Sequence, residues 1–172
     1  VLFRSRIVDY FSLQYTASKK IHVSANAYES YLKGLYHSKN SGKDANGLAI
    51  EYFSEALQAD SKFPDCLVAL AYDQGFRFVQ GWDTSDKLLG EAEANCKKAL
   101  DLDPNNSNAT AVLGFIELSR GNQQAAIDRF QQSLDKNPSN GVALDNLAQI
   151  YLLSLNNPTK GLTYYKKLVE IN

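Results

Sequence analysis

Two segments of the chain have closely similar sequences and lie at a fixed separation. Residues 99–106 are ALDLDPNN and residues 133–140 are SLDKNPSN, so that Pro104 and Pro138 are 34 residues apart. A period of this length is typical of proteins built from stacked supersecondary units, each of which buries its apolar face only against its neighbours. The period therefore predicts a repeat protein before any local propensity is considered.

The best-preserved unit, residues 107–140, predicts a pair of helices. The first ends at a turn containing Gly121, because glycine accepts the left-handed backbone that often closes a helix. The second ends before Pro138, because proline cannot continue the hydrogen-bond ladder. Small residues that let the helices approach, and bulky residues that fill the space between them, occupy characteristic places: Leu113, Gly114, Ala126 and Phe130.

This spacing resembles the tetratricopeptide repeat, whose pattern is W-x2-L-G-x2-Y, then A-x3-F, then P over 34 residues. The resemblance covers residues 25–172 and implies an all-α fold, a right-handed superhelix of four helix-turn-helix repeats preceded by one N-terminal helix. We expect the repeats at approximately 25–63, 64–106, 107–140 and 141–172.

The other three repeats depart from the standard pattern in small ways. In the first, Tyr31 and Leu32 hold the Leu-Gly places. In the second, the connector is longer than standard and contains Trp82. In the fourth, one extra residue is expected within 156–158. These departures affect loops and register, so they leave the predicted fold class unchanged.

The start of the chain is expected to lie outside the repeats. Residues 1–5 resemble the translation of a sequencing adapter, and we interpret them as a non-native scar. Residues 6–24 carry an apolar stripe at helical spacing and predict an N-terminal helix and linker. On this interpretation the chain is a piece of a longer protein.

The composition favours no catalytic or nucleic-acid-binding function. The net charge is −1, and the lysines occur in isolated pairs, whereas phosphate binding needs a concentrated basic face. His22 and His37 have no Cys or acidic partners at metal-ligand spacing. Cys66 and Cys96 sit at apolar helical positions and are expected to be buried reduced thiols, although a disulfide between them stays open. We therefore expect no enzyme, cofactor or metal, and a cytoplasmic location, or a periplasmic one if the parent protein has a transmembrane helix upstream.

The expected binding surface is the concave groove lined by the first helix of each repeat. Its positions are offset from the core stripe by helical periodicity. The predicted peptide-binding residues are Asn26, Glu29, Lys33, Tyr36, Asp65, Val68, Tyr72, Asn108, Ala111, Phe115, Leu118, Val142, Asp145, Gln149 and Leu152. An alternative is that Tyr72, Phe115 and Leu118 pack only against neighbouring helices.

We expect a non-catalytic scaffold that binds a protein or peptide, either an amphipathic helix or an extended segment, and neither nucleic acid nor membrane. Some members of the family bind acidic chaperone tails through Lys and Asn in the groove; only Lys33 fits that pattern. Self-association through the last helix is a further expectation. The alternative function follows from a looser resemblance to the repeat regions of bacterial adenylate-cyclase-like proteins and winged-helix transcriptional regulators. That resemblance implies a C-terminal sensory or regulatory region that binds a small molecule or its own effector domain.

Overall fold

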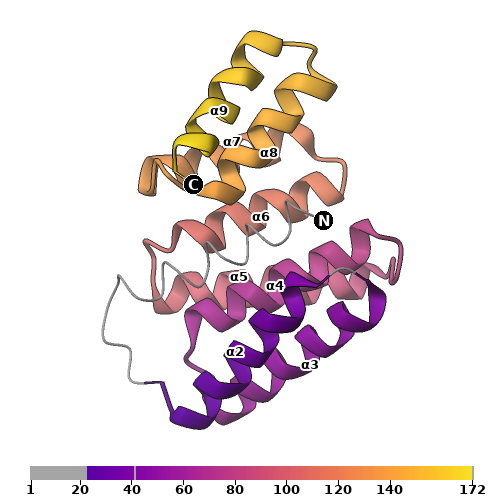
Figure 1. The fold of residues 1–172 in the computed structure, drawn as a ribbon, viewed down its shortest axis with the longest axis vertical. Helices are drawn as coiled ribbons and strands as arrows, with labels where there is room; N and C mark the ends of the chain where they lie inside the picture. Colours follow the sequence, from indigo (N-terminus) through magenta and orange to yellow (C-terminus); the bar gives the residue numbers. More distant parts are fainter. Residues whose placement is uncertain (1–22, 41, 172) are drawn as a thin grey trace. The chain divides into compact units, whose positions relative to one another are not determined.

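The structure, a computed structural model, describes residues 23–40 and 42–171. These residues form helices joined by short connectors, with no β-strand among them (Figure 1). No helix in this described part combines the length and apolar character needed to cross a bilayer. The described residues divide into two compact units, one ending at Pro104 and the other beginning at Asn105.

Unit 1 contains two helical hairpins. Its helices are α2 (Ala25–Lys39), α3 (Lys43–Ala59), α4 (Pro64–Val79) and α5 (Asp86–Leu102). Helices α2 and α5 begin after serines whose side chains accept backbone N–H bonds, Ser24 from Ala27 and Ser85 from Leu88. Helix α4 begins with proline, which loses no helical hydrogen bond at the first position. Helix α3 then packs against α4, which joins the two hairpins.

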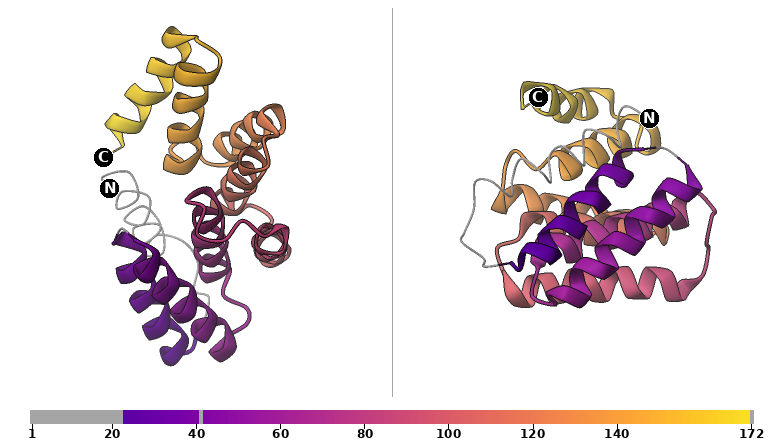
Figure 2. Two further views of the ribbon diagram at one scale, coloured as in Figure 1. Left: turned by 90° about the vertical axis from the view of Figure 1, so that its right-hand side faces the viewer. Right: turned by 60° about the horizontal axis from the view of Figure 1, so that its bottom comes forward.

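Unit 2 repeats this plan. Its helices are α6 (Ser107–Ser119), α7 (Gln123–Lys136), α8 (Gly141–Gln149) with the π-helical turn η1 (Ile150–Ser154), and α9 (Pro158–Glu170). Asparagine caps α6, α8 and α9 through its side-chain oxygen, at Asn106, Asn140 and Asn157. The paired helices of each hairpin run side by side in opposite directions, as the two further views show (Figure 2). The predicted all-α tetratricopeptide fold is confirmed for the described residues.

The close helix packing predicted for the third repeat is present. A Cβ atom placed on Gly114 would lie 2.8 Å from Phe130 Cε1, so only glycine allows α6 and α7 to approach this closely. Ala126 and Phe130 are fully buried beside it. Large buried side chains continue this core within each unit, for example Tyr31, Phe53 and Phe63 in unit 1 and Ile116, Leu144 and Leu147 in unit 2.

Two predictions fall outside the residues that the structure describes. The scar at residues 1–5 and nearly all of the predicted N-terminal helix and linker, residues 6–24, precede Val23. The first helices of the four hairpins begin at Ala25, Pro64, Ser107 and Gly141, the residues at which the repeats were expected to start.

Candidate functional site

The predicted groove residues differ widely in exposure. Those on α2 are exposed, as is Gln149 on α8. Asp65, Phe115, Leu118 and Leu152 are half-buried. The remaining six are buried: Val68, Tyr72, Asn108, Ala111, Val142 and Asp145. These positions therefore do not form one uniformly open surface, and two of the differences have identifiable structural causes.

The first cause is a shift of register in α2. The repeat pattern places Leu32 at the glycine position, but Leu32 is exposed. The close contact is made instead by Gly34, where an added Cβ would clash with the ring of Phe53. Phe53 of α3 thus has the role that Phe130 has in α7, and the helix is turned by two residues relative to the prediction. Consequently Lys33 and Tyr36 lie at other repeat positions than those from which they were predicted.

The second cause lies at the end of α8. The extra residue of the fourth repeat was predicted in the connector, but the structure absorbs it in η1, where the N–H of Leu155 donates to the carbonyl of Ile150 over 3.0 Å. This turn places Leu152 against α9. A Cβ added to Gly161 would lie 2.5 Å from Leu152 Cγ, so Leu152 packs inside its own hairpin.

A buried polar network organises unit 1 beside the groove positions of α4. Asp73 accepts hydrogen bonds from Ser38 Oγ at 2.5 Å and from Asn46 Nδ2 at 2.8 Å. Arg77 Nη1 donates to Asn46 Oδ1 over 3.3 Å. Buried polar groups are stable only when they are bonded, so this network specifies how α2, α3 and α4 meet.

Unit 2 has an equivalent network centred on Asn140. Its Oδ1 caps α8 by accepting from the N–H of Ala143, while its Nδ2 donates to Asn108 Oδ1 at 2.7 Å and to Ser107 Oγ at 3.2 Å. Asn108 is one of the predicted groove residues. Its side-chain oxygen is therefore already engaged in holding α6 against the start of α8.

Asp145, another predicted groove residue, is less completely satisfied. Its Oδ2 accepts from Gln149 Nε2 at 2.9 Å, whereas its Oδ1 is buried without a hydrogen-bond partner. Burial raises the pKa of Asp145, and the bond from Gln149 opposes that rise. A buried carboxylate oxygen of this kind is best satisfied by an N–H donor or a cation.

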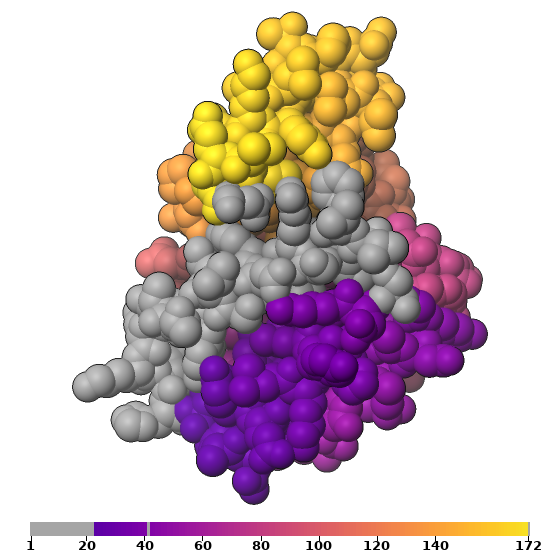
Figure 3. All heavy atoms as spheres, viewed as in Figure 1, coloured from indigo at the N-terminus to yellow at the C-terminus, as the bar shows by residue number. Residues whose placement is uncertain are grey.

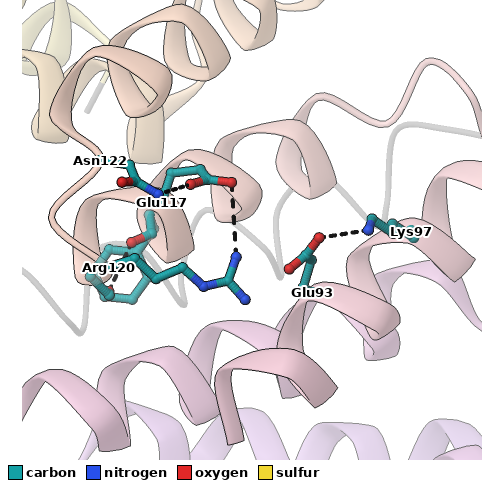
Figure 4. Close-up of polar contacts among 7 residues, drawn as sticks. Glu93, Lys97, Glu117, Arg120 and Asn122 are labelled. Carbon is teal, nitrogen blue, oxygen red and sulfur yellow. Dashed lines mark hydrogen bonds and ion pairs between the residues drawn. The ribbon is translucent and has the colours of Figure 1, made fainter. Parts of the chain in front are cut away.

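The surface ion pairs on α5 and at the end of α6 join residues that are three or four positions apart in the sequence. On α5, Lys97 Nζ lies 2.6 Å from Glu93 Oε1. At the end of α6, Asn122 Nδ2 donates to Glu117 Oε2 over 2.8 Å, and Arg120 Nη1 lies 3.9 Å from Glu117 Oε1 (Figure 4). Pairs of this kind contribute at most about 1 kcal/mol each, so they do not by themselves mark a binding site.

The described residues include no metal-binding cluster and no exposed thiol. No group of three or more His, Cys, Asp or Glu side chains within them could hold a metal ion. Cys66 and Cys96 are free and buried, and burial raises the pKa of both thiols, which makes them poor nucleophiles. Cys66 Sγ is engaged with the carbonyl of Phe53 at 3.3 Å.

The hairpins, their glycine–phenylalanine contacts and the capped repeat starts define a helical repeat protein of the kind whose first helices line extended binding surfaces. The sequence model of the tetratricopeptide repeat matches residues 142–172. This match identifies a tetratricopeptide repeat in the last hairpin, and the other hairpins have the same helix-turn-helix fold.

One curated relative is the photosystem I assembly protein Ycf3 of Rippkaea orientalis, which is 36% identical over 70 residues. The alignment covers 39% of this chain and 40% of that protein, so the chain spans less than half of its relative's length.

Two solved structures share the fold. The crystal structure of MamA has a TM-score of 0.56 at 17% identity, covering 95% of this chain and 85% of that one. The first tetratricopeptide domain of Spaghetti (RPAP3), bound to the HSP90 peptide SRMEEVD, has a TM-score of 0.57 at 21% identity, covering 77% and 97%.

Proposed function

We propose that this chain is a non-catalytic scaffold that binds a protein or peptide through the first helices of its repeats. The observation that carries the proposal is the fold itself, a series of tetratricopeptide hairpins, because the first helices line the recognition surface in repeat proteins of this kind. The Spaghetti (RPAP3) domain, which has the same fold, is bound to a peptide. The small-molecule sensory role stays an untested prediction.

The partner segment should carry apolar anchors together with Lys or Arg. Phe115 and Leu118 on α6 are half-buried apolar groove residues, and Asp145 on α8 adds a buried carboxylate whose negative charge favours a basic segment. Anchors of this type supply most of the energy of an interface, whereas the charges around them set preference and association rate. An amphipathic helix or an extended basic segment fits these features better than an acidic tail or a nucleic acid does.

The revised register narrows the proposed surface. In unit 1 it retains only the half-buried Asp65 on α4, because Val68 and Tyr72 are buried, and it leaves out the α2 residues Glu29, Lys33 and Tyr36. In unit 2 it consists of residues on α6 and α8, without Leu152.

Two buried reduced thiols support a cytoplasmic location as part of the same proposal. Self-association through α9 uses a different surface from this one.

A selection of displayed random peptides against the purified chain tests the proposal. We expect selected peptides with apolar anchors and Lys or Arg, and Phe115→Ala should weaken their binding by about 2 kcal/mol. Asp145→Asn should mainly slow association with basic peptides at low salt. Leu102→Ala, which removes an exposed apolar side chain from the second helix α5, is the matched control. Equal binding by Phe115→Ala and by this control would contradict the proposed surface.

A further inference from the structure

Asparagine is followed directly by glycine at two places in the chain, Asn46–Gly47 and Asn140–Gly141. Glycine has no side chain to shield its backbone nitrogen, and its backbone is unusually mobile in an unfolded chain. An Asn–Gly pair is therefore the sequence in which a backbone nitrogen most readily attacks the preceding side-chain amide. Both asparagines are fully buried, so they lie beneath the surface drawn as spheres in Figure 3.

Each of these asparagines is the centre of the buried polar network of its unit. In unit 1, Asn46 Nδ2 donates to the Asp73 carboxylate at 2.8 Å and to the Asp73 carbonyl at 3.0 Å. Asn46 Oδ1 accepts from Arg77. In unit 2, Asn140 Nδ2 donates to two side chains of α6, while its Oδ1 caps α8. In both places the amide is a donor and an acceptor at once, which an ionised carboxyl group cannot be.

The reaction that an Asn–Gly pair permits is deamidation. The backbone nitrogen of the glycine bonds to Cγ of the asparagine, and the amide nitrogen leaves as ammonia with the proton of the glycine N–H. Water then opens the resulting cyclic succinimide at either of its carbonyl groups, which gives aspartate or isoaspartate. The amide donor is lost in both products, and isoaspartate also lengthens the main chain.

The folded structure opposes ring closure at both sites. Gly47 lies inside α3, where its N–H belongs to the helical hydrogen-bond ladder. The carboxamide of Asn46 cannot turn back toward this nitrogen without breaking the bonds of the unit 1 network. The side chain of Asn140 reaches forward to the N–H of Ala143 at 3.0 Å, so its approach to the Gly141 nitrogen would uncap α8. Modification therefore requires at least local unfolding.

We propose that Asn46 and Asn140 are deamidation sites that the fold protects, and that deamidation of an unfolded chain prevents it from regaining its native packing. Each unit thus has its most reactive amide at the position where the amide is most needed. The inference depends on the two buried networks and not on the proposed function.

The two sites should differ in how much the aspartate product disturbs the fold. At Asn46 the new carboxylate oxygen would face the carboxylate of Asp73 in a buried site, where like charges are costly, and the contact with Arg77 offsets only part of that cost. At Asn140, aspartate is itself a good N-cap, and Asn108 can turn its amide to donate to the new oxygen. Aspartate should therefore be tolerated better at 140 than at 46.

Peptide mapping by mass spectrometry tests the protection, with the whole chain incubated at mildly alkaline pH in a native sample and in urea. In urea, Asn46 and Asn140 should be converted faster than Asn146, which is followed by leucine. In the native sample their conversion should be slower by at least about a hundredfold, because only rare openings expose them. Equal rates in the two samples would overturn the inference.

Gly47→Ala is the matched variant that tests the consequence for unit 1. Alanine fits at this position, since the added Cβ would lie 3.9 Å from Arg77 Nη1, and its methyl group hinders ring closure in the unfolded chain. After equal incubation in urea and dilution, the variant should retain Asn46 and regain more of the native circular dichroism than the unaltered chain does.

Asn46→Asp, which carries the aspartate product from synthesis, completes this test. It should recover as poorly as the deamidated chain without any incubation. Full recovery of Asn46→Asp, or equal recovery of Gly47→Ala and an unaltered chain that has lost its Asn46 amide, would show that the native packing tolerates the product. Either result would overturn the inference.

Discussion

The two hairpins of unit 2 achieve close helix packing in opposite ways. In α6/α7 the glycine is on the first helix and the bulky partner, Phe130, is on the second. In α8/α9 the glycine, Gly161, is on the second helix and the bulky partner, Leu152, is on the first. The repeat thus preserves a close approach between helices, while the side that supplies the space can change.

The same comparison explains why the hairpins differ at their outer surfaces. Phe130 fills the gap left by Gly114 and is completely buried. Tyr165, its counterpart in α9, has lost this role, because Leu152 already occupies the space beside Gly161. Tyr165 is therefore free to contribute to an outward-facing surface.

The largest expected effect comes from removing the two aromatic counterparts. Phe130→Ala should lower the free energy of unfolding by about 3–5 kcal/mol, because it leaves a cavity in a fully packed site. Tyr165→Ala should cost much less, since its ring is partly in water already. Urea unfolding of both variants measures the difference. Equal losses would show that α9 packs like α7, contrary to the comparison.

Substitution of either glycine should lower the free energy of unfolding, but the residue against which the new side chain clashes differs between the two sites. Gly114→Leu should cost about 1–3 kcal/mol by overpacking against Phe130. Gly161→Ala should cost a similar amount, because the added Cβ would also lie 3.0 Å from the backbone nitrogen of Leu152. Thermal unfolding monitored by circular dichroism compares each variant with the unaltered chain.

The matched control for these glycines is Gly90→Ala in α5. Gly90 is exposed inside a helix, and nothing lies within 4 Å of an added Cβ. Alanine there should stabilise the chain by about 0.5–1 kcal/mol, because it restricts the unfolded state without a clash.

A second substitution, Leu152→Ala, should partly restore the stability that Gly161→Ala loses, but not the stability that Gly114→Leu loses. The same relief for both would mean that Leu152 does not lie against Gly161.

The repeat pattern anticipates the helix starts well, but it could not place every residue within a helix. Leu32 and Gly34 both lie near the place that the repeat pattern gives to the close-packing residue. Only the contact with Phe53 shows that Gly34 is that residue. An extra residue can be absorbed in a loop or in a π-helical turn, and composition does not distinguish these outcomes. The groove prediction depends on register, so it needed revision in the first repeat and at Leu152.

The last prediction concerns the half-buried carboxylate of Asp65 at the start of α4. Burial, with a smaller contribution from the charge of Asp103, raises the pKa of Asp65 to about 6. A carboxyl group whose pKa is higher in the folded state favours folding when it is protonated. Its contribution is therefore complete below its unfolded pKa, near 4, and is lost as the pH rises through about 6.

Asp65→Asn removes this pH dependence. The variant should gain stability relative to the unaltered chain between about pH 4 and pH 7, by about 2 kcal/mol at most, because the favourable field of the helix N-terminus acts against the burial cost. Urea unfolding of both proteins across this range gives the difference between their free energies of unfolding. The contributions of the other titrating groups, which both proteins share, cancel in this difference. Asp86→Asn makes the same change at an exposed first-turn position of α5 and should show no such rise. A flat difference curve for Asp65→Asn would mean that water reaches the carboxylate in the folded chain.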